Sequence, residues 1–520
     1  MQRKNNVDII AHVSRSVVEA RLEEMRHTPQ PPAPDWLLYH MALLSHQPRA
    51  VTSSTISSPT TEAYRHPIEP PCSGRIRDRS PPWRVTPNNH IMSDEDEPLI
   101  IAPNGDLILD VAQEEHSQRF SYRVDSKILQ ENSRYFENLL SDRFSEGQRL
   151  SAALEALKLS QHSNLADAPI DVLPHISIVN VGRVAVLKAS SVQNLVLDFL
   201  RAIHGVDLAV TNPPVANLAN LAVVADRFDA VACLSRYVQR KKYLQVVDAK
   251  SKGKSSPTLT EERVRQKLLI GLLFDHPSWV TKYSKHIIMR DSVQWRPGVE
   301  EDHTRALWWD IPNGVEDELI QRREYILETI NSLQAHFLKL YTSGERQCKL
   351  GYDTSLQCDS FQLGEMVRFF HKIDTVRLQG KIYDNTEPTY YLGDIDRLLV
   401  SLRQCSNYQV DANHSHCGLR SRLLPLLDLI QNQLSLDTGS LDIGICADCW
   451  DHHRAEYAWS LAKRPVLWAH PRSLMGNRTL ANGFLRKGHQ RTPSSCLSRH
   501  VAVRDLFMAV ERNWTARDVF

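Results

Sequence analysis

The sequence predicts an α+β protein, in which a short β-sheet capped by a helical cluster is followed by a mainly α-helical C-terminal region. Two observations support this fold class. Alternating apolar residues at 107–111 and 120–124 run directly into an amphipathic helix that begins near Ser126. From about residue 192 onward, apolar residues recur with the period of core-facing helices. The chain has 520 residues, enough for two or three domains.

Bulk composition is that of an ordinary globular protein, with 42% hydrophobic and 24% charged residues. The net charge of +1 gives no global attraction to nucleic acid or anionic membrane. No run approaches the ~18 apolar residues of a membrane-spanning helix, and the N-terminus lacks the apolar core of a signal peptide. Nine scattered cysteines do not resemble a secreted disulfide framework. We therefore expect an intracellular protein, cytoplasmic or nuclear, with no membrane association.

The first 91 residues differ in composition from the rest. Between residues 30 and 89 the chain is rich in Pro, Ser, Thr and Arg, and such a stretch cannot bury enough apolar surface to offset chain entropy. We predict that residues 1–91 form a disordered extension. Because Met92 opens an acidic segment directly before the strand pattern, we hypothesise that this extension is dispensable.

The first ordered region is expected at residues 98–245. Its two strands are followed by a segment at 145–172 that looks like an insertion holding one helix, 152–159. A third strand is predicted at 176–179, because apolar residues return there in alternation. Three helices complete the region, at 192–204, 215–228 and 230–243.

Beyond this region, a linker rich in Lys and Ser is predicted at 246–258. An α-rich domain follows at 259–470, with helices expected at 259–274, 279–289 and 315–341. A basic, poorly ordered tail with a candidate terminal helix is expected at 471–520. No internal repeat is evident in the chain.

Several motifs occur in this order at 98–245. Asp106 opens a strand of alternating aliphatic residues, and Ile128-Leu129 lies in the first helix, followed by Ser133, Tyr135 and Phe136. Further on come a helix ending in His204-Gly205 and the run Ala225-Asp226-Arg227-Phe228. This order resembles a BTB/POZ domain, a protein-interaction module. Its signature would comprise Asp106, Leu109, Asp125, Ile128, Leu129, Ser133, Tyr135, Phe136, Ala225, Asp226 and Phe228.

The resemblance departs from the family at one position, because Asp125 stands where a histidine is expected. An aspartate there is a good N-cap, so the helix start is chemically preserved. A second resemblance covers Cys405–Trp450, which is similar to the C-terminal half of uncharacterised fungal BTB-containing proteins. The BTB resemblance implies self-association as a homodimer, docking of protein partners and a cullin-type ubiquitin ligase as one such partner. No enzymatic activity is implied, and the partner-binding residues stay unknown.

A rival interpretation is a nuclear factor associated with transcription or chromatin. It rests on a basic segment that could contact nucleic acid: Arg236, Arg240, Lys241 and Lys242, with Lys250, Lys252 and Lys254 after it. The favoured alternative is a solvated helix end, because cations are stabilising at a helix C-terminus. Nucleic-acid binding is therefore not our main expectation.

One group of histidines and cysteines has the residue types and spacing of metal ligands. His414-x-x-Cys417 and Cys446-x-x-Cys449 each have a turn-sized spacing, and a predicted helix at 419–434 separates them. Together they could supply four ligands to a structural zinc ion, with Cys405, His416, His452 and His453 as substitutes. The alternatives are buried free thiols beside solvent-facing histidines, and a redox pair at Cys446 and Cys449.

Two motifs of common catalytic sites are incomplete or absent in the sequence. Gly253-Lys254-Ser255 would need a further glycine where Asp248 stands, so it is not a phosphate-binding loop. No Gly-x-Ser-x-Gly nucleophile motif occurs. We therefore predict no enzyme and no certain cofactor, apart from the candidate zinc.

Overall fold

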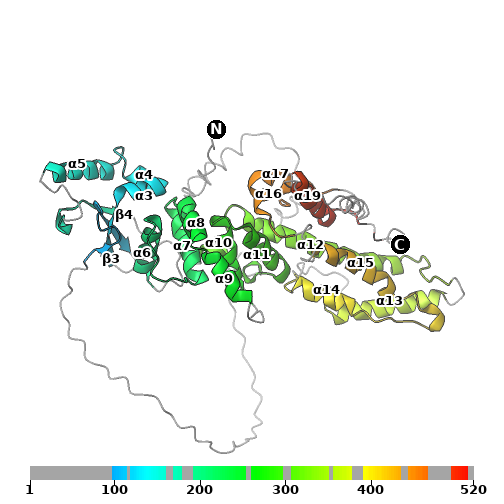
Figure 1. Ribbon diagram of the computed structural model, residues 1–520. Helices are drawn as coiled ribbons and strands as arrows, with labels where there is room; N and C mark the ends of the chain where they lie inside the picture. The colour runs from blue at the N-terminus through cyan, green and yellow to red at the C-terminus, as the bar shows by residue number, and fades with distance from the viewer. Residues whose placement is uncertain are drawn as a thin grey trace, which may run out of the picture. The chain divides into compact units, whose positions relative to one another are not determined.

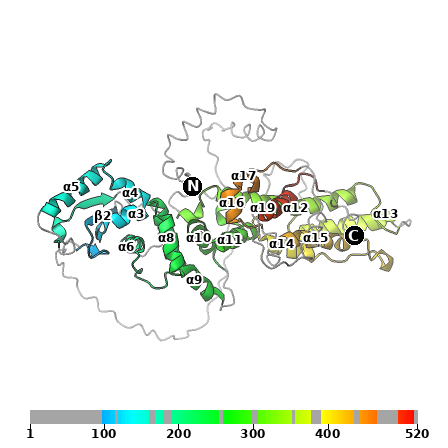
Figure 2. The ribbon, with the colours of Figure 1, turned by 45° about the horizontal axis from the view of Figure 1, so that its top comes forward.

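The computed structural model describes residues 97–113, 118–159, 168–178, 191–252, 259–296, 306–350, 355–376, 391–434, 443–465, 494–512 and Trp514 (Figures 1 and 2). All of them belong to one compact unit of the chain, residues 90–520. The predicted extension at 1–91 and the first part of the predicted tail, 471–493, lie outside the described residues. The α+β class is confirmed: the described part is rich in helices and contains a small mixed sheet.

The sheet has four strands in the order β1-β3-β2-β4: β1 Leu99–Ile100, β2 Leu107–Gln113, β3 Gln118–Val124 and β4 His175–Ile178. The β2–β3 pair is antiparallel, and β1 and β4 run parallel to their neighbours. A turn at Gly105 brings β2 close to the end of β3. A side chain there would place its Cβ 2.5 Å from the carbonyl oxygen of Val124, so only glycine fits this approach.

Seven helices accompany the sheet: α3 Ser126–Asn132, α4 Arg134–Leu139, α5 Ser145–Leu159, α6 Val192–Ile203, α7 Val215–Arg227, α8 Val231–Arg240 and α9 Tyr243–Lys252. Polar residues begin several of them. The side chains of Asp125, Ser133 and Ser191 accept hydrogen bonds from the first turns of α3, α4 and α6. These helix starts are therefore capped by residues that are adjacent in the sequence.

Two helices occupy residues at which no helix was predicted. Helix α5 begins seven positions before the predicted start at residue 152 and includes Leu150, whose side chain joins the main core. Helix α9 continues to Lys252, through the first half of the predicted linker. It is held there because Asp248 accepts hydrogen bonds from the indole N–H of Trp279, at 3.1 and 3.0 Å.

Helices dominate the described residues of the C-terminal part: α10 Glu261–Leu273, α11 Pro277–Arg290, α12 Val315–Thr342, α13 Ser355–Lys372, α14 Ile395–Arg403, α15 Leu419–Leu434, α16 Ala447–His452, α17 Arg454–Tyr457 and α19 Ser494–Met508. Short 3₁₀ turns lie at Ile170–Val172, Val293–Trp295, Leu307–Trp309 and Ala412–His414. Among the described helices, none combines the length and the apolar character needed to cross a membrane.

One apolar core runs through both parts. Helix α10 packs against α7 on one side and α11 on the other, and its residues from Val264 to Gly271 are buried. This buried helix joins the small sheet region to the helical region, and its apolar residues belong to a core that both parts share. Helix α19 packs on α12 and α17, and it lies beside α16 and α17 in both views (Figures 1 and 2).

A buried arginine on α12 fixes the segment that precedes α16. Arg322 forms an ion pair with Glu318 and donates to the carbonyl oxygens of Ile443 and Gly444, at 2.8 and 3.0 Å. Its guanidinium also lies 4.8 Å from the ring centre of Tyr457. Gly444 passes so close to α11 that a Cβ would lie 2.2 Å from the carbonyl oxygen of Thr281. The cysteines that follow this segment are therefore placed by the core.

Candidate metal centres

The residues predicted as an N-terminal signature make caps and core contacts. Asp106 accepts hydrogen bonds from the backbone N–H and the hydroxyl of Ser126, at 2.8 and 2.7 Å. Asp125 caps α3 as expected, accepting from the backbone N–H groups of Lys127 and Ile128 at 3.0 and 3.1 Å. These bonds tie the start of the first helix to the start of β2.

Further signature residues meet around one aromatic cluster. The hydroxyl of Ser133 donates to the carbonyl oxygen of Phe228 at 2.6 Å and accepts from the backbone N–H of Phe136. The rings of Tyr135 and Phe136 lie 5.1 and 5.6 Å from the ring of Phe228. Residues from two distant motifs therefore share a single core.

The remaining signature residues are also not exposed. Leu109, Leu129 and Ala225 are fully buried, and Asp226 is half-buried. Burial, and then the nearby carboxylate of Asp229, raises the pKa of Asp226. The signature residues therefore contribute to the packing and capping of this region.

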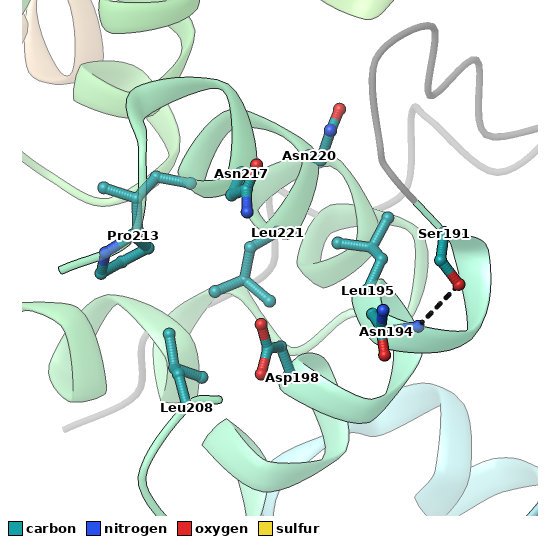
Figure 3. A pocket seen from close by; sticks show the side chains of 10 residues that line it. Ser191, Asn194, Leu195, Asp198, Leu208, Pro213, Asn217, Asn220 and Leu221 are labelled. Carbon is teal, nitrogen blue, oxygen red and sulfur yellow. Dashed lines mark hydrogen bonds between the residues drawn. The ribbon is translucent and has the colours of Figure 1, made fainter. Parts of the chain in front are cut away.

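A pocket lies between α6 and α7, with Asp198 and Asn217 on either side of Leu221 (Figure 3). Asp198 accepts a hydrogen bond from the backbone N–H of Ala209, so its carboxylate already has a partner. The space within the pocket is about 40 Å³, room for a few water molecules. This volume is too small for an organic cofactor or substrate.

Two Cys/His clusters in the C-terminal part are better candidates for a functional site than this pocket. The first centre consists of Cys348, Cys358, His414 and Cys417, and the second consists of Cys446, Cys449, Cys496 and His500. In each centre the four ligand atoms lie within 4.8 Å of one another. The described cysteines are all free, so no disulfide accounts for this proximity. Each cluster could hold a metal ion such as zinc.

The first centre gathers ligands from three separate stretches. Cys348 follows α12, Cys358 lies in α13, and His414 and Cys417 lie in the turn that precedes α15. All four are buried, none more than 5% exposed. The three cysteines form a small apolar cluster of their own with Leu350, apart from the main core.

Distances in the first centre match a tetrahedral site. The sulfur of Cys348 lies 3.8 Å from that of Cys417 and 3.5 Å from Nδ1 of His414. With Zn–S of about 2.3 Å and Zn–N of about 2.0 Å, a tetrahedron separates sulfur atoms by about 3.8 Å, and sulfur from nitrogen by about 3.5 Å. Nε2 of His414 faces the carboxylate of Asp411 at 3.8 Å. A carboxylate behind a ligating histidine is the usual support for such a ligand.

The thiols of the first centre differ in acidity. Burial opposes ionisation of Cys348, but hydrogen bonds from Leu350, Ser355 and the neighbouring thiols outweigh it and lower the pKa of Cys348 to about 7. Burial, and then the neighbouring Cys417 and Cys348, raises the pKa of Cys358 to about 12. Because the pKa of Cys358 is raised, its ionisation near neutral pH requires a nearby cation.

The second centre has the same ligand set on different elements. Cys446 and Cys449 come from the first turn of α16, and Cys496 and His500 lie one turn apart on α19. The sulfur of Cys496 lies 4.0 Å from that of Cys446 and 3.9 Å from that of Cys449. Nδ1 of His500 lies 3.4 Å from Cys449 and 3.5 Å from Cys496. These separations again fit the edges of a zinc tetrahedron.

Its surroundings differ from those of the first centre. Only Cys449 is buried, and the other three ligands are half-buried. Burial, and then the neighbouring Cys446 and Cys496, raises the pKa of Cys449. The backbone N–H of Cys446 donates to the hydroxyl of Tyr457 at 2.7 Å, which links this centre to the buried Arg322.

The four ligands predicted from the sequence do not meet. His414 and Cys417 belong to the first centre, and Cys446 and Cys449 belong to the second. The physical reason is the helix between the two pairs: α15 has 16 residues and rises about 24 Å. None of the predicted substitutes, Cys405, His416, His452 and His453, joins either centre.

Sequence reasoning missed four ligands: Cys348, Cys358, Cys496 and His500. A signal existed for the last two, because Cys-x-x-x-His on a helix places both side chains on one face. The pair Cys348 and Cys358, with nine residues between them, has no characteristic spacing. Only the packing of α12, α13 and the turn before α15 brings them to His414 and Cys417.

Comparisons with known proteins found no counterpart: no protein-family model matches the chain, and neither a curated protein nor a solved structure matches it.

Proposed function

We propose that this chain is a non-catalytic protein-interaction adaptor, with a BTB/POZ-type module at 98–245 and a zinc-stabilised helical region after it. The interaction-module half of this proposal rests on one observation: Ser133, Tyr135 and Phe136 contact Phe228 in one core. Motifs nearly a hundred positions apart in the sequence thus meet in one core, which supports the resemblance to the BTB family. A cullin-type ubiquitin ligase is the partner class that this proposal favours.

A further contact supports the module. The histidine expected at position 125 is absent, but an imidazole reaches the same helix start from α6. Nε2 of His204 accepts a hydrogen bond from the backbone N–H of Asp125 at 3.1 Å. Burial lowers the pKa of His204, which favours the neutral ring that this bond requires.

The basic segment after α7 gives little support to a DNA-binding role. Lys241 contacts the carboxylate of Asp207, and the guanidinium of Arg240 lies 5.7 Å from the ring centre of Tyr237. These cations are engaged with their own chain, as expected for a helix end. Binding to nucleic acid is therefore the outcome that would count against the adaptor proposal.

The test of the adaptor role uses the full-length chain, purified with its partners from cells and then remixed with purified cullin. We expect a cullin among the partners and direct binding that changes little with salt. Steeply salt-dependent DNA binding, with chromatin proteins and no ligase component, would overturn the proposal. Light scattering on the same sample tests for the homodimer.

The second half of the proposal is that zinc serves a structural role in the helical region. Four protein ligands in each centre would fill a tetrahedral ion, leaving no position at which to activate water. Metal analysis of the full-length chain, purified without added metal, tests this directly. We expect about two zinc ions per chain, and a folded chain free of zinc would end the claim.

A further inference from the structure

The second centre joins two segments that are far apart in the sequence. Cys446 and Cys449 belong to the segment that Arg322 and Tyr457 fix to the core. Cys496 lies 47 positions after Cys449, on a different helix. A metal ion bound by all four ligands would therefore cross-link α16 to α19.

Contacts along α19 are unevenly distributed. The apolar side chains that bury this helix, Val503, Leu506, Phe507 and Met508, lie in its last two turns. The ring of Phe507 stacks on Trp459 at 5.9 Å, and its carbonyl oxygen accepts from Thr329. The C-terminal half of the helix is thus held by ordinary packing.

The N-terminal half of α19 has fewer such contacts. Cys496, Leu497 and His500 are half-buried, and Ser498 is exposed. The ring of His500 lies 5.5 Å from that of Tyr457. Cys496 and His500 are therefore positions through which these first turns meet α16 and α17.

Solvent reaches this centre more easily than the first one. Three of its four ligands are half-buried, whereas every ligand of the first centre is at most 5% exposed. The shell around a metal site controls the access of water and chelators. The same ligand chemistry should therefore exchange its ion at different rates in the two centres.

We propose that the second centre is a releasable zinc clasp. A zinc ion on Cys446, Cys449, Cys496 and His500 fixes the first turns of α19 against α16 and α17, and it leaves while the zinc of the first centre stays bound. This inference rests on the proposed structural zinc and adds a regulatory property to one of the two sites. Zinc availability then sets whether residues 494–502 are docked.

The experiment starts from the zinc-loaded full-length chain and adds excess chelator, with a chromogenic zinc indicator to follow release. We expect two phases of one equivalent each, the fast one at least ~10-fold faster than the slow one. Hydrogen exchange, measured after the fast phase, should show lost protection at 494–502 and retained protection at 503–508.

Variants assign the phases to the centres. His500→Asn and Cys496→Ser should each abolish the fast phase and keep the slow one. Cys233→Ser, a half-buried cysteine outside both centres, should keep both phases. Release of both equivalents at one rate, a fast phase that survives Cys496→Ser, or unchanged protection at 494–502 would each overturn the clasp. If the purified chain holds no zinc at all, the structural-zinc proposal itself fails.

Discussion

The two Cys/His centres have the same four ligand types and nearly the same internal distances, but they occupy different kinds of place. The first is enclosed, and its cysteines form a separate small cluster with Leu350 where the main apolar core does not reach. The second borders the main core, which already includes Cys449 and Trp450. A metal ion in the first centre would thus take the place of an apolar core, whereas one in the second centre would add to an apolar core that is already there. Ligand identity alone does not determine what a metal site contributes to stability.

The largest expected effect tests the first half of this comparison. Cys417→Ser should lower the free energy of unfolding by more than about 4 kcal/mol, because it removes one of four buried candidate ligands in a cluster that lies apart from the main apolar core. Urea denaturation monitored by circular dichroism, with zinc analysis of each sample, measures the change. Cys405→Ser is the control, since Cys405 is equally buried but lies outside both centres. It should cost about 1–3 kcal/mol and retain both zinc ions.

A smaller effect is expected in the second centre. Cys496→Ser should lower the free energy of unfolding by about 1–2 kcal/mol, because Phe507 and Met508 still anchor the rest of α19. The same denaturation measurement applies. A loss as large as that of Cys417→Ser would show that the two centres are energetically alike, and the comparison would fail.

The carboxylate of Asp411, which faces His414, should have a third and smaller effect, on the zinc affinity of the first centre. Asp411→Asn keeps the side-chain oxygen that caps the backbone N–H of Asn413 but removes the charge that faces His414. Zinc affinity of the first centre should fall about 10-fold, or about 1.4 kcal/mol. Competition with a chelator of known affinity measures it. The second centre of the same molecule is the internal control, and an equal loss there would contradict this assignment.

The smallest effect concerns access to the thiols. In the chelator-treated chain, an alkylating reagent should label Cys446 and Cys496 before Cys358 and Cys417, because the first pair is half-buried and the second pair is buried. Cys348 separates the effect of acidity from the effect of exposure. Its lowered pKa of about 7 favours the reactive thiolate, but burial hinders the reagent. Mass spectrometry of timed samples gives the order, and early labelling of Cys348 would show that acidity outweighs exposure.

Local signals in the sequence were enough to predict most of the elements. The alternation at 107–111 and the capping residue Asp125 placed β2 and α3, because strand period and helix caps depend on neighbouring residues. The extent of α9 was not predictable in this way. Its Lys- and Ser-rich second half is typical of a linker, and it stays helical alongside a hydrogen bond from the distant Trp279 to Asp248.

The metal ligands show the same limit more clearly. Residue types and short spacings predicted His414, Cys417, Cys446 and Cys449 as candidate ligands, but placed all four in one site, whereas the structure divides them between two clusters. Pairing depends on where α13 and α19 pack, and that is a property of the tertiary fold. The candidate tail helix is a case in point: α19 joins the core through Phe507 and Met508 and supplies half of the second centre.

The order of the ligands along the chain also bears on synthesis. All four ligands of the first centre lie within a 70-residue stretch, and they leave the ribosome before Cys446 does. Cys446 and Cys449 are synthesised before His500, which follows Cys449 by 51 residues. At 5–20 residues per second this interval is roughly 3–10 s. During that time the nascent chain carries Cys446 and Cys449 without the other two candidate ligands of the second centre.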